Sequence, residues 1–97
     1  MTVVWLQPAV ADLENIIAYL LERNPQAAVD VYDAIRQQVG QLAEFPLLGR
    51  PGRVAGTREL MITGLPYIVP YYRKGREVRM LAVLHTSRKW PDEFDFS

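Results

Sequence analysis

The chain opens with a short apolar segment, and apolar residues then recur at helical spacing. Residues 2–6 (TVVWL) are rich in β-branched and aromatic side chains, which predicts a strand. Pro8 suits the first turn of a helix, where a missing N–H leaves no hydrogen bond unmade. An apolar stripe follows at i, i+3, i+7 and i+10 or i+11, formed by Val10, Leu13, Ile17 and Leu20 or Leu21. This spacing predicts an amphipathic helix that ends near Arg23.

A second helix is predicted directly after the first. Asn24 and Pro25 form a restart signal, because asparagine is a preferred N-cap and proline is favoured at the next position. The helix is expected to run to about Ala43. Its apolar positions share one face: Ala28, Val31, Ile35, Val39 and Leu42. The short connection predicts an antiparallel helical hairpin.

The second half of the chain changes to the pattern of strands and turns. Residues 44–57 contain two prolines and three glycines and therefore read as a loop. Strands are predicted over residues 58–63, 67–73 and 77–84, with turns between them. Pro70 removes one ladder donor from the middle strand, so a bulge or a locally unpaired edge is expected there.

Helices in one half and strands in the other predict an α+β fold, in a single domain over residues 1–97. An N-terminal strand and a helical hairpin pack on an antiparallel β-sheet formed with a C-terminal three-stranded meander. Alternation then sorts the side chains of the last strand. The core face takes Val78, Met80, Ala82 and Leu84, and the other face takes Arg79, Leu81, Val83 and His85. We expect the polar strand ends to converge on the face that the helices leave open.

Charge is distributed unevenly along this chain of formal net charge zero. Residues 1–47 carry two basic and six acidic side chains, a net charge of −4. Residues 48–91 carry nine basic and two acidic ones, a net charge of +7, and seven of the nine are arginine. Arginine is suited to bidentate anion contacts. The basic block predicts either a surface that meets an anion or a sheet edge guarded by charge.

Composition argues against several classes of protein. With no cysteine, the chain forms no disulfide and uses no thiolate chemistry, which fits a reducing compartment. A single histidine without cysteine argues against a metal site. The sequence has no glycine-rich phosphate-binding motif and no apolar run of membrane-spanning length. We therefore expect a cytoplasmic domain that uses neither metal nor cofactor and has no membrane partner.

The segment at residues 83–91 (VLHTSRKWP) gathers polar residues at the end of the last predicted strand. His85 and Thr86 are adjacent on a strand and point to opposite faces, so they are badly placed as base and nucleophile. Cleavage of RNA through its 2′-hydroxyl remains open, since it needs a base, an acid and cations around the phosphate. Groups that could supply acid and charge are Arg58, Arg73, Arg79, Arg88, Tyr71, Tyr72 and His85. A general base is harder to name.

Two residues of this segment also have simpler explanations. His85 can be a structural hydrogen-bonding group at the strand end. Trp90, which precedes a proline, can be a hydrophobic plug rather than a ring that stacks on a base. The sequence leaves both pairs of interpretations open.

Together these segments resemble the RelE/ParE superfamily of bacterial toxins, which belong to type II toxin–antitoxin modules. The resemblance covers nearly the whole chain. It is carried above all by three motifs: G-x-R-E at 56–59, P-Y-I-V-x-Y at 66–71 and V-L-H-x-x-R at 83–88. It implies the same strand, helical hairpin and sheet that the patterns predict.

The superfamily has two activities. RelE-like members are ribosome-dependent mRNA endonucleases with an arginine in the strand after the turn at 64–66, where this chain has Ile68. An isoleucine cannot stabilise the charge of a reacting phosphate. ParE-like members inhibit DNA gyrase and lack the nuclease residues. The resemblance therefore favours a gyrase inhibitor that binds rather than catalyses; mRNA cleavage is the alternative, and a small nucleic-acid-binding module is a third reading.

The resemblance also implies partners. A cognate antitoxin would fold on the toxin, often as a helix, and form a toxin–antitoxin hetero-oligomer. Its basic residues could dock on acids of the helices, namely Asp12, Glu14, Asp30 and Asp33. The residues expected to bind the target are Arg58, Arg73, Arg79, His85, Arg88 and Trp90. If the chain is a nuclease, the catalytic candidates are Arg58, Arg73, His85 and Arg88.

Overall fold

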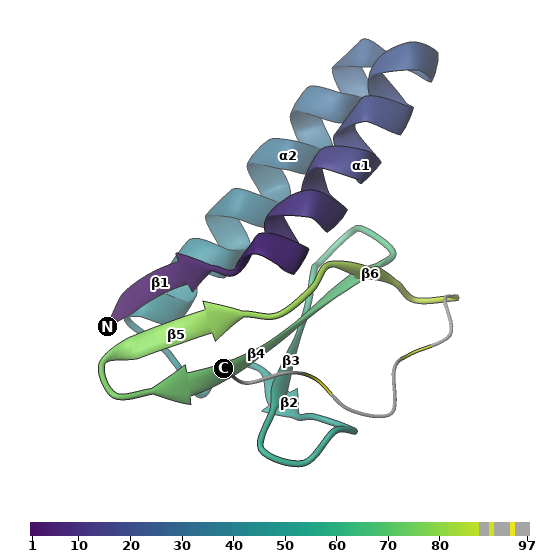
Figure 1. The fold of residues 1–97 in the computed structure, drawn as a ribbon. Helices are drawn as coiled ribbons and strands as arrows, with labels where there is room; N and C mark the ends of the chain where they lie inside the picture. Colours follow the sequence, from purple (N-terminus) through teal and green to yellow (C-terminus); the bar gives the residue numbers. More distant parts are fainter. Residues whose placement is uncertain (88–89, 91–93, 95–97) are drawn as a thin grey trace.

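The computed structural model describes residues 1–87 together with Trp90 and Phe94, and within these it shows two long helices on a six-stranded sheet. The elements are β1 (Thr2–Trp5), α1 (Gln7–Arg23), α2 (Pro25–Gly40), the 3₁₀ helix η1 (Gln41–Ala43), β2 (Arg50–Pro51), β3 (Arg58–Met61), β4 (Tyr67–Lys74), β5 (Glu77–Met80) and β6 (Leu84–His85). The helices lie side by side, and their far end extends beyond the sheet (Figure 1). The predicted α+β fold is confirmed.

A single residue connects the two helices. Asn24 follows α1 and caps α2, since its side-chain oxygen accepts a hydrogen bond from the N–H of Ala27 at 3.1 Å. Pro25 occupies the first position of α2, as predicted. The predicted apolar stripe of α2 is buried, whereas of the α1 stripe Leu13 is buried and Leu21 is 51% exposed. The second helix ends at Gly40 and continues to residue 43 as η1.

The sheet has the strand order β1-β5-β4-β3-β2, and β6 pairs with β4 beyond the end of β5. The C-terminal strands form an antiparallel meander, as predicted. The N-terminal strand β1 adds to β5 in parallel, with Val3 opposite Val78. The sheet is therefore mixed rather than wholly antiparallel. A parallel neighbour needs a long crossover, which the helical hairpin and the intervening strands supply.

The last predicted strand, residues 77–84, is interrupted. β5 ends at Met80 and β6 begins at Leu84, so residues 81–83 lie outside the ladder. The interruption faces Pro70 of β4, which has no N–H to donate and accepts a bond from the N–H of Leu81 at 2.9 Å. The expectation of a locally unpaired edge at Pro70 is confirmed.

The interruption changes which side chains face the helices. From this segment the main core takes Val78, Met80 and Val83. The predicted core places of residues 82 and 84 are wrong, although both side chains are buried outside this cluster. Because residues 81–83 lie outside the ladder, the alternation of side chains between the two faces shifts by one residue after Met80. His85 therefore lies on the helix-facing side, opposite Tyr67 and beside α1, rather than on the face of Arg79 as predicted.

The main core fills the space between the helices and one face of the sheet. It consists of Ala9, Leu13, Val31, Ile35, Val39, Leu42, Leu60, Ile62, Val69, Tyr71, Val78, Met80 and Val83. Burying one aliphatic side chain of this size stabilises a fold by about 1.5–3 kcal/mol. This core fixes the sheet against the hairpin and so determines where the strand ends lie.

Residues 44–57 are not the plain loop that the sequence predicts. The two residues of β2 pair with the start of β3 and form an edge of the sheet. The chain approaches the sheet so closely that a Cβ at Gly49 would lie 2.7 Å from the hydroxyl of Tyr71 and 2.8 Å from the carbonyl oxygen of Glu59. Glycine at this position therefore allows the segment to bring its arginines beside β3.

Candidate functional site

A buried carboxylate organises the start of β3. Glu59 is 1% exposed, and its Oε1 accepts hydrogen bonds from Nε and Nη2 of Arg50 at 3.2 and 2.9 Å. Its Oε2 accepts bonds from the backbone N–H and from Nε of Arg53 at 2.8 and 3.2 Å. About half of each arginine side chain stays exposed, 49% for Arg50 and 48% for Arg53. One buried anion thus holds two partly exposed cations.

These contacts decide the ionisation of Glu59. Burial would by itself raise the pKa of the carboxyl group. The backbone bond from Arg53 and the side-chain bonds from Arg50 and Arg53 outweigh burial, so the pKa lies below its ordinary value of 4.5. The carboxylate is therefore charged at neutral pH.

Arg58 and Tyr71 hold the segment that carries these arginines. Nη1 of Arg58 donates to the carbonyl oxygen of Gly49 at 2.8 Å. The Tyr71 hydroxyl donates to the carbonyl oxygen of Pro46 at 2.9 Å and accepts from the N–H of Gly49 at 2.9 Å. Burial raises the pKa of the Tyr71 phenol, which stays neutral. Tyr71, a candidate acid on the sequence, is thus committed to positioning the loop.

Trp90 packs on the same segment. The guanidinium carbon of Arg53 lies 3.7 Å from the centroid of the indole ring, a cation–π contact. Arg53 is therefore held along one edge by Glu59 and on one face by Trp90. The indole Nε1–H is buried and has no hydrogen-bond partner among the residues that the structure describes. The ring is half-buried, but its neighbour is a cation rather than an apolar cluster.

The remaining predicted arginines lie elsewhere. Arg73 is exposed, and its Nε donates to the carbonyl oxygen of Gly75 at 3.1 Å in the β4–β5 turn. Arg79 faces away from the helices, where its Nε donates to Glu77 at 2.8 Å and its Nη1 to the Tyr72 hydroxyl at 3.3 Å. Arg88 lies outside the described residues.

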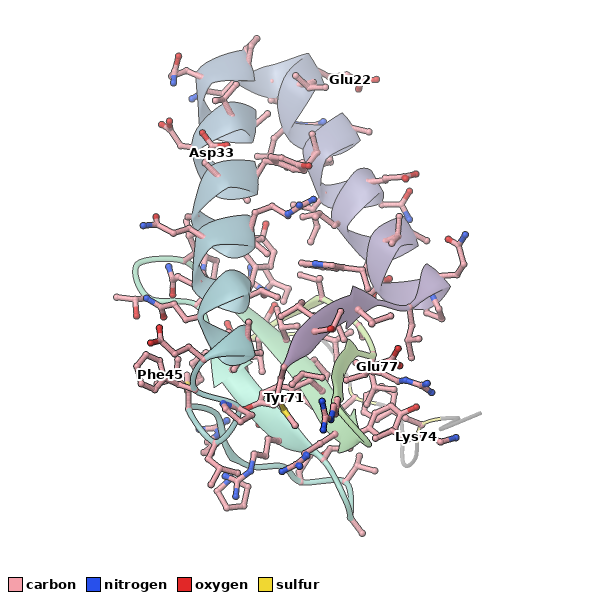
Figure 2. All side chains as sticks on the ribbon, turned by 90° about the vertical axis from the view of Figure 1, so that its left-hand side faces the viewer. Glu22, Asp33, Phe45, Tyr71, Lys74 and Glu77 are labelled. Carbon is pink, nitrogen blue, oxygen red and sulfur yellow. The ribbon has the colours of Figure 1, made fainter. Side chains whose placement is uncertain are left out.

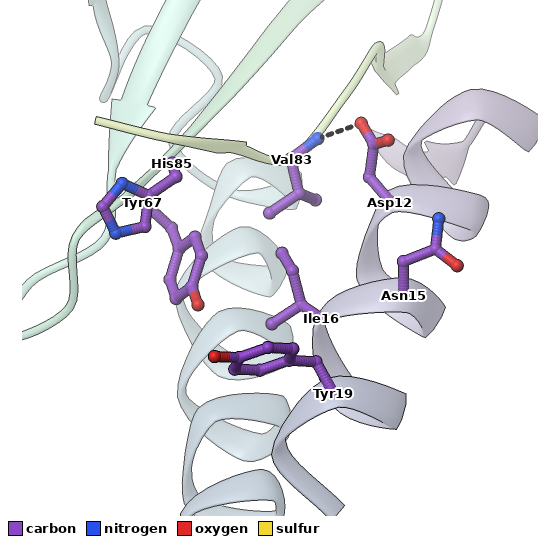
Figure 3. Close-up of a pocket in the computed structure, with 7 residues that line it drawn as sticks. All are labelled: Asp12, Asn15, Ile16, Tyr19, Tyr67, Val83 and His85. Carbon is purple, nitrogen blue, oxygen red and sulfur yellow. Dashed lines mark hydrogen bonds between the residues drawn. The ribbon is translucent and has the colours of Figure 1, made fainter. Parts of the chain in front are cut away.

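His85 lies in a separate pocket of about 290 Å³ between α1 and the β4–β6 pair (Figure 3). The pocket is lined by Asp12, Asn15, Ile16, Tyr19, Tyr67, Val83 and His85. The rings of Tyr67 and His85 meet edge to face with centroids 5.6 Å apart. Asp12 accepts the backbone N–H of Val83 at 3.0 Å, which ties α1 to the interrupted strand. Burial, together with the nearby Tyr19, raises the pKa of Tyr67.

Ser87 occupies one nitrogen of His85. The backbone N–H of Ser87 donates to Nδ1 at 3.1 Å, and the Ser87 hydroxyl lies 2.7 Å from the same atom. A backbone N–H can only donate, so Nδ1 carries the lone pair and the neutral ring bears its proton on Nε2. The basic nitrogen is thus engaged within the strand end, which supports the structural interpretation of His85.

The predicted site residues do not converge. His85 pairs with Tyr67 at the start of β4, and Arg73 is six positions farther along this strand. At about 3.3 Å per residue, Arg73 lies roughly 20 Å from Tyr67. Arg58 lies between them, opposite Tyr71. Arg50 and Arg53 meet at Glu59, whereas Arg58 lies on the opposite face of β3, the face of Leu60 and Tyr71. Arg58 is separated from His85 and Arg79.

Sequence reasoning missed Arg50, Arg53 and Glu59 as a unit. The two arginines stand in a segment without periodicity, where side-chain directions cannot be predicted. The available signal was Glu59 itself, the one acid of its strand, which stands within a strongly basic block. A charged residue at such a place is buried only when it is paired, which points to neighbouring arginines.

An apolar groove of about 400 Å³ runs between α1 and α2. It is lined by Trp5, Val10, Leu13, Glu14, Ile17, Ala18, Leu21, Tyr32 and Arg36. Exposed apolar side chains, among them Tyr19 and Val29, add to the apolar surface of the hairpin. Of the predicted docking acids, Glu14 borders this groove, Asp12 lines the His85 pocket, and Asp30 and Asp33 are exposed on α2.

A metal-binding cluster and a membrane-spanning helix are both absent from the described part of the chain. No group of three or more His, Cys, Asp or Glu side chains there is placed to hold a metal ion. None of its helices combines the length and the apolar character needed to cross a membrane.

Comparison with known proteins places the chain among bacterial toxins. Residues 3–90 match the family described as the ParE toxin of the type II toxin–antitoxin system parDE. The toxin Y4kP of Sinorhizobium fredii is 44% identical over 87 residues, which is 90% of each chain. Toxin RelE2 of Caulobacter vibrioides is 34% identical over 86 residues, 89% of this chain and 96% of that protein.

The fold matches as well. A solved structure of the chromosomal ParDE toxin–antitoxin system from P. aeruginosa superposes with a TM-score of 0.81 and 30% identity, over 88% of this chain and 95% of the other. The resemblance to the RelE/ParE superfamily is thereby confirmed. The chain belongs to the ParE toxin family of type II toxin–antitoxin systems.

Proposed function

We propose that this toxin arrests growth by binding DNA gyrase in the cytoplasm and that a cognate antitoxin neutralises it in a toxin–antitoxin hetero-oligomer. On this proposal the chain acts by binding and not as an enzyme. The family match supports the module, and the arrangement of the candidate residues supports the mode of action.

The observation that carries the proposal is the state of His85. A metal-independent nuclease needs an acid–base group beside cations that surround one phosphate. Nδ1 of His85 is engaged by Ser87, and His85 lies about 20 Å along β4 from the level of Arg73. Ile68, at the place of the nuclease arginine, is 3% exposed and carries no charge. Both features favour binding over cleavage.

The target-binding surface that we propose lies at the end of the sheet where β3 begins and β4 ends. Arg58 and Arg73 stand there, and Trp90 packs on Arg53 in the segment that leads into β3. His85 and Arg79, also expected to bind the target, lie apart from this surface and would touch gyrase only across a wider contact.

For the antitoxin, the groove between α1 and α2 is the surface that we favour. Its lining is mostly apolar, with Glu14 and Arg36 as the charged residues. An amphipathic helix can place its apolar face in such a groove and pair a basic residue with Glu14. Asp30 and Asp33 extend the acidic surface along α2.

A gyrase assay tests the proposal. Purified toxin is incubated with supercoiled plasmid, gyrase and ATP, and the products are deproteinised and separated on a gel. Linear plasmid that depends on both toxin and gyrase is the expected result. Normal supercoiling without linear product at saturating toxin would refute gyrase as the target.

The alternative is cleavage of ribosome-bound mRNA. The name of the Caulobacter relative, Toxin RelE2, supports considering it, because RelE-like toxins are mRNA endonucleases. Primer extension on mRNA in a translating extract distinguishes the two activities. New 5′ ends that appear only with ribosomes would favour the alternative. Alanine at both His85 and Arg88 tests whether these residues act at the target. Loss of growth arrest by a folded double variant would support that role, and full toxicity would refute it.

A further inference from the structure

Two arginines next to β3 are held in fixed positions before any ligand arrives. We call Arg50 and Arg53 the arginine cluster. Both are bonded to Glu59, one to each carboxylate oxygen. A free arginine loses rotamer freedom when it binds an anion. The arginines of this cluster have already lost that rotamer freedom in the folded protein.

The geometry of the cluster suits phosphate groups. Glu59 uses one edge of each guanidinium, and about half of each side chain stays exposed. The planar guanidinium fork matches the oxygens of a phosphate in a way that a lysine ammonium does not. The guanidinium of Arg53 lies over the ring of Trp90, and this contact limits its movement. After Glu59 is subtracted, the cluster keeps a net charge of +1.

More cations lie at the same end of the sheet. The register sets Arg58 opposite Tyr71, and three residues farther along β4 Lys74 pairs with Glu77 at the β4–β5 turn. Arg73, Lys74 and Arg76 are exposed there. Acidic side chains lie away from this end on the helical hairpin, with Glu22 near its tip and Asp33 farther down α2 (Figure 2). A long polyanion would therefore be attracted to this end of the molecule and repelled from the other.

We propose that the arginine cluster binds consecutive backbone phosphates of DNA and that Glu59 is the positioning residue that holds the cluster in its binding geometry. This deepens the proposed function, because gyrase acts on DNA and a toxin bound to gyrase would lie near that DNA. Phosphate contacts of this kind position a protein on nucleic acid without reading its sequence. A preorganised pair of arginines gains affinity because its ordering cost is met on folding.

Glu59→Gln gives a test in which two explanations predict opposite signs. The substitution adds one unit of net positive charge. If charge alone attracts DNA, affinity must rise. If Glu59 positions the arginines, affinity falls because Arg50 and Arg53 lose their anchor. Glu44→Gln, at an exposed glutamate, adds the same charge without disturbing the cluster and is the matched control.

The measurement is fluorescence anisotropy of a labelled DNA duplex at several NaCl concentrations, with circular dichroism to confirm folding. Arg50→Gln and Arg53→Gln are each expected to weaken binding about threefold to tenfold and to lower the slope of log K against log salt by about one. Arg23→Gln, at the far end of the hairpin, serves as the charge-matched control. Glu59→Gln is expected to bind at least threefold more weakly than the wild type.

Two outcomes would overturn the inference. One is an unchanged affinity and salt slope in the double variant of Arg50 and Arg53, or tighter binding by folded Glu59→Gln. The other is loss of binding to DNA-free gyrase subunits in the double variant while DNA binding persists, which would assign the cluster to an acidic protein surface. DNA binding is measured without gyrase, so a failed plasmid assay would refute the proposed function and leave this inference standing.

Discussion

Tyr71 positions a loop through one buried hydroxyl. The residue is 1% exposed, and its hydroxyl bridges the carbonyl oxygen of Pro46 and the N–H of Gly49. The loop between these two residues leads directly into β2 and its arginine. The position of Arg50 therefore depends on an oxygen atom of a side chain in β4.

Replacing Tyr71 by phenylalanine tests this dependence. The ring fills the same space, but a partly buried carbonyl and a buried N–H lose their partner. We therefore expect Tyr71→Phe to lower the free energy of unfolding by about 1–3 kcal/mol. Urea denaturation measures the change. Tyr19→Phe, at a tyrosine that is 57% exposed, is the control and should shift the value by less than about 0.5 kcal/mol. Equal effects at the two positions would contradict the bridging role.

Glu59 makes the stability of the fold depend on pH. A carboxyl group whose pKa is lower in the folded than in the unfolded chain stabilises the folded state above its unfolded pKa, and this contribution disappears as the pH falls through the folded pKa. The pKa of Glu59 is lowered from 4.5. At pH 7 we expect Glu59→Gln to be less stable than the wild type by about 1–3 kcal/mol.

The difference between the two proteins should shrink as the pH falls below about 4.5. Denaturant titrations at pH 7, 5, 4 and 3 would measure it, with Glu44→Gln as a control for the loss of a carboxylate. A difference that stays constant from pH 7 to pH 3 would show that Glu59 is not titrating against its arginines.

At the scale of the elements, the hairpin depends on a connection of one residue. Asn24 ends α1 and also caps α2 through its bond to the N–H of Ala27. We expect Asn24→Ala to lower the free energy of unfolding by about 1 kcal/mol, because an N-terminal N–H of α2 loses its acceptor. Asn24→Asp keeps an acceptor and should restore most of the loss. Thermal unfolding of both variants decides between capping and a general effect of shortening the side chain.

Gly49 and Gly40 are glycines for different reasons: the chain at Gly49 lies close against the sheet, whereas Gly40 has free space around it. A Cβ at Gly49 would lie 2.7 Å from Tyr71 and 2.8 Å from Glu59, whereas nothing lies within 4 Å of one at Gly40. Gly40 has helical dihedral angles at the end of α2. We expect Gly40→Ala to stabilise the fold by up to about 1 kcal/mol and Gly49→Ala to destabilise it by about 1–3 kcal/mol. The added methyl group thus raises the stability at one position and lowers it at the other, and differential scanning calorimetry can measure both changes.

Elements whose signals are local were predicted well. Asn24 and Pro25 announce the start of α2, and the spacing of Val31, Ile35 and Val39 places its buried face, because these depend on neighbours within one or two turns. The strand after β5 was predicted less well. Its interruption depends on Pro70 and on the bond from the N–H of Val83 to Asp12, which is 71 positions away in the sequence. No pattern within the strand itself contains that information.

At the scale of the whole molecule, the charge asymmetry of the sequence becomes an asymmetry of shape. The helical hairpin, whose residues carry a net negative charge, extends away from the sheet (Figure 1). The exposed Arg73, Lys74 and Arg76 lie at the end of β4 and in the turn that follows it. The net charges of the two halves predict this separation, but they do not predict which arginines stand together. The arginine cluster arises because β2, only two residues long, pairs with β3 and brings Arg50 against Glu59.

The missing N–H of Pro70 divides the C-terminal half of the chain into parts that exchange their amide hydrogens independently. β5 lies between β1 and β4, with four residue pairs on each side. β6 is held by two pairs to β4 and by the bond from Thr86 N–H to Pro66 at 2.9 Å. We expect β5 amides to exchange with deuterium only through global unfolding and those of Leu84 to Thr86 through local opening, as hydrogen–deuterium exchange by NMR can show. The segment that carries His85 would thus detach repeatedly while the core and the arginine cluster stay folded.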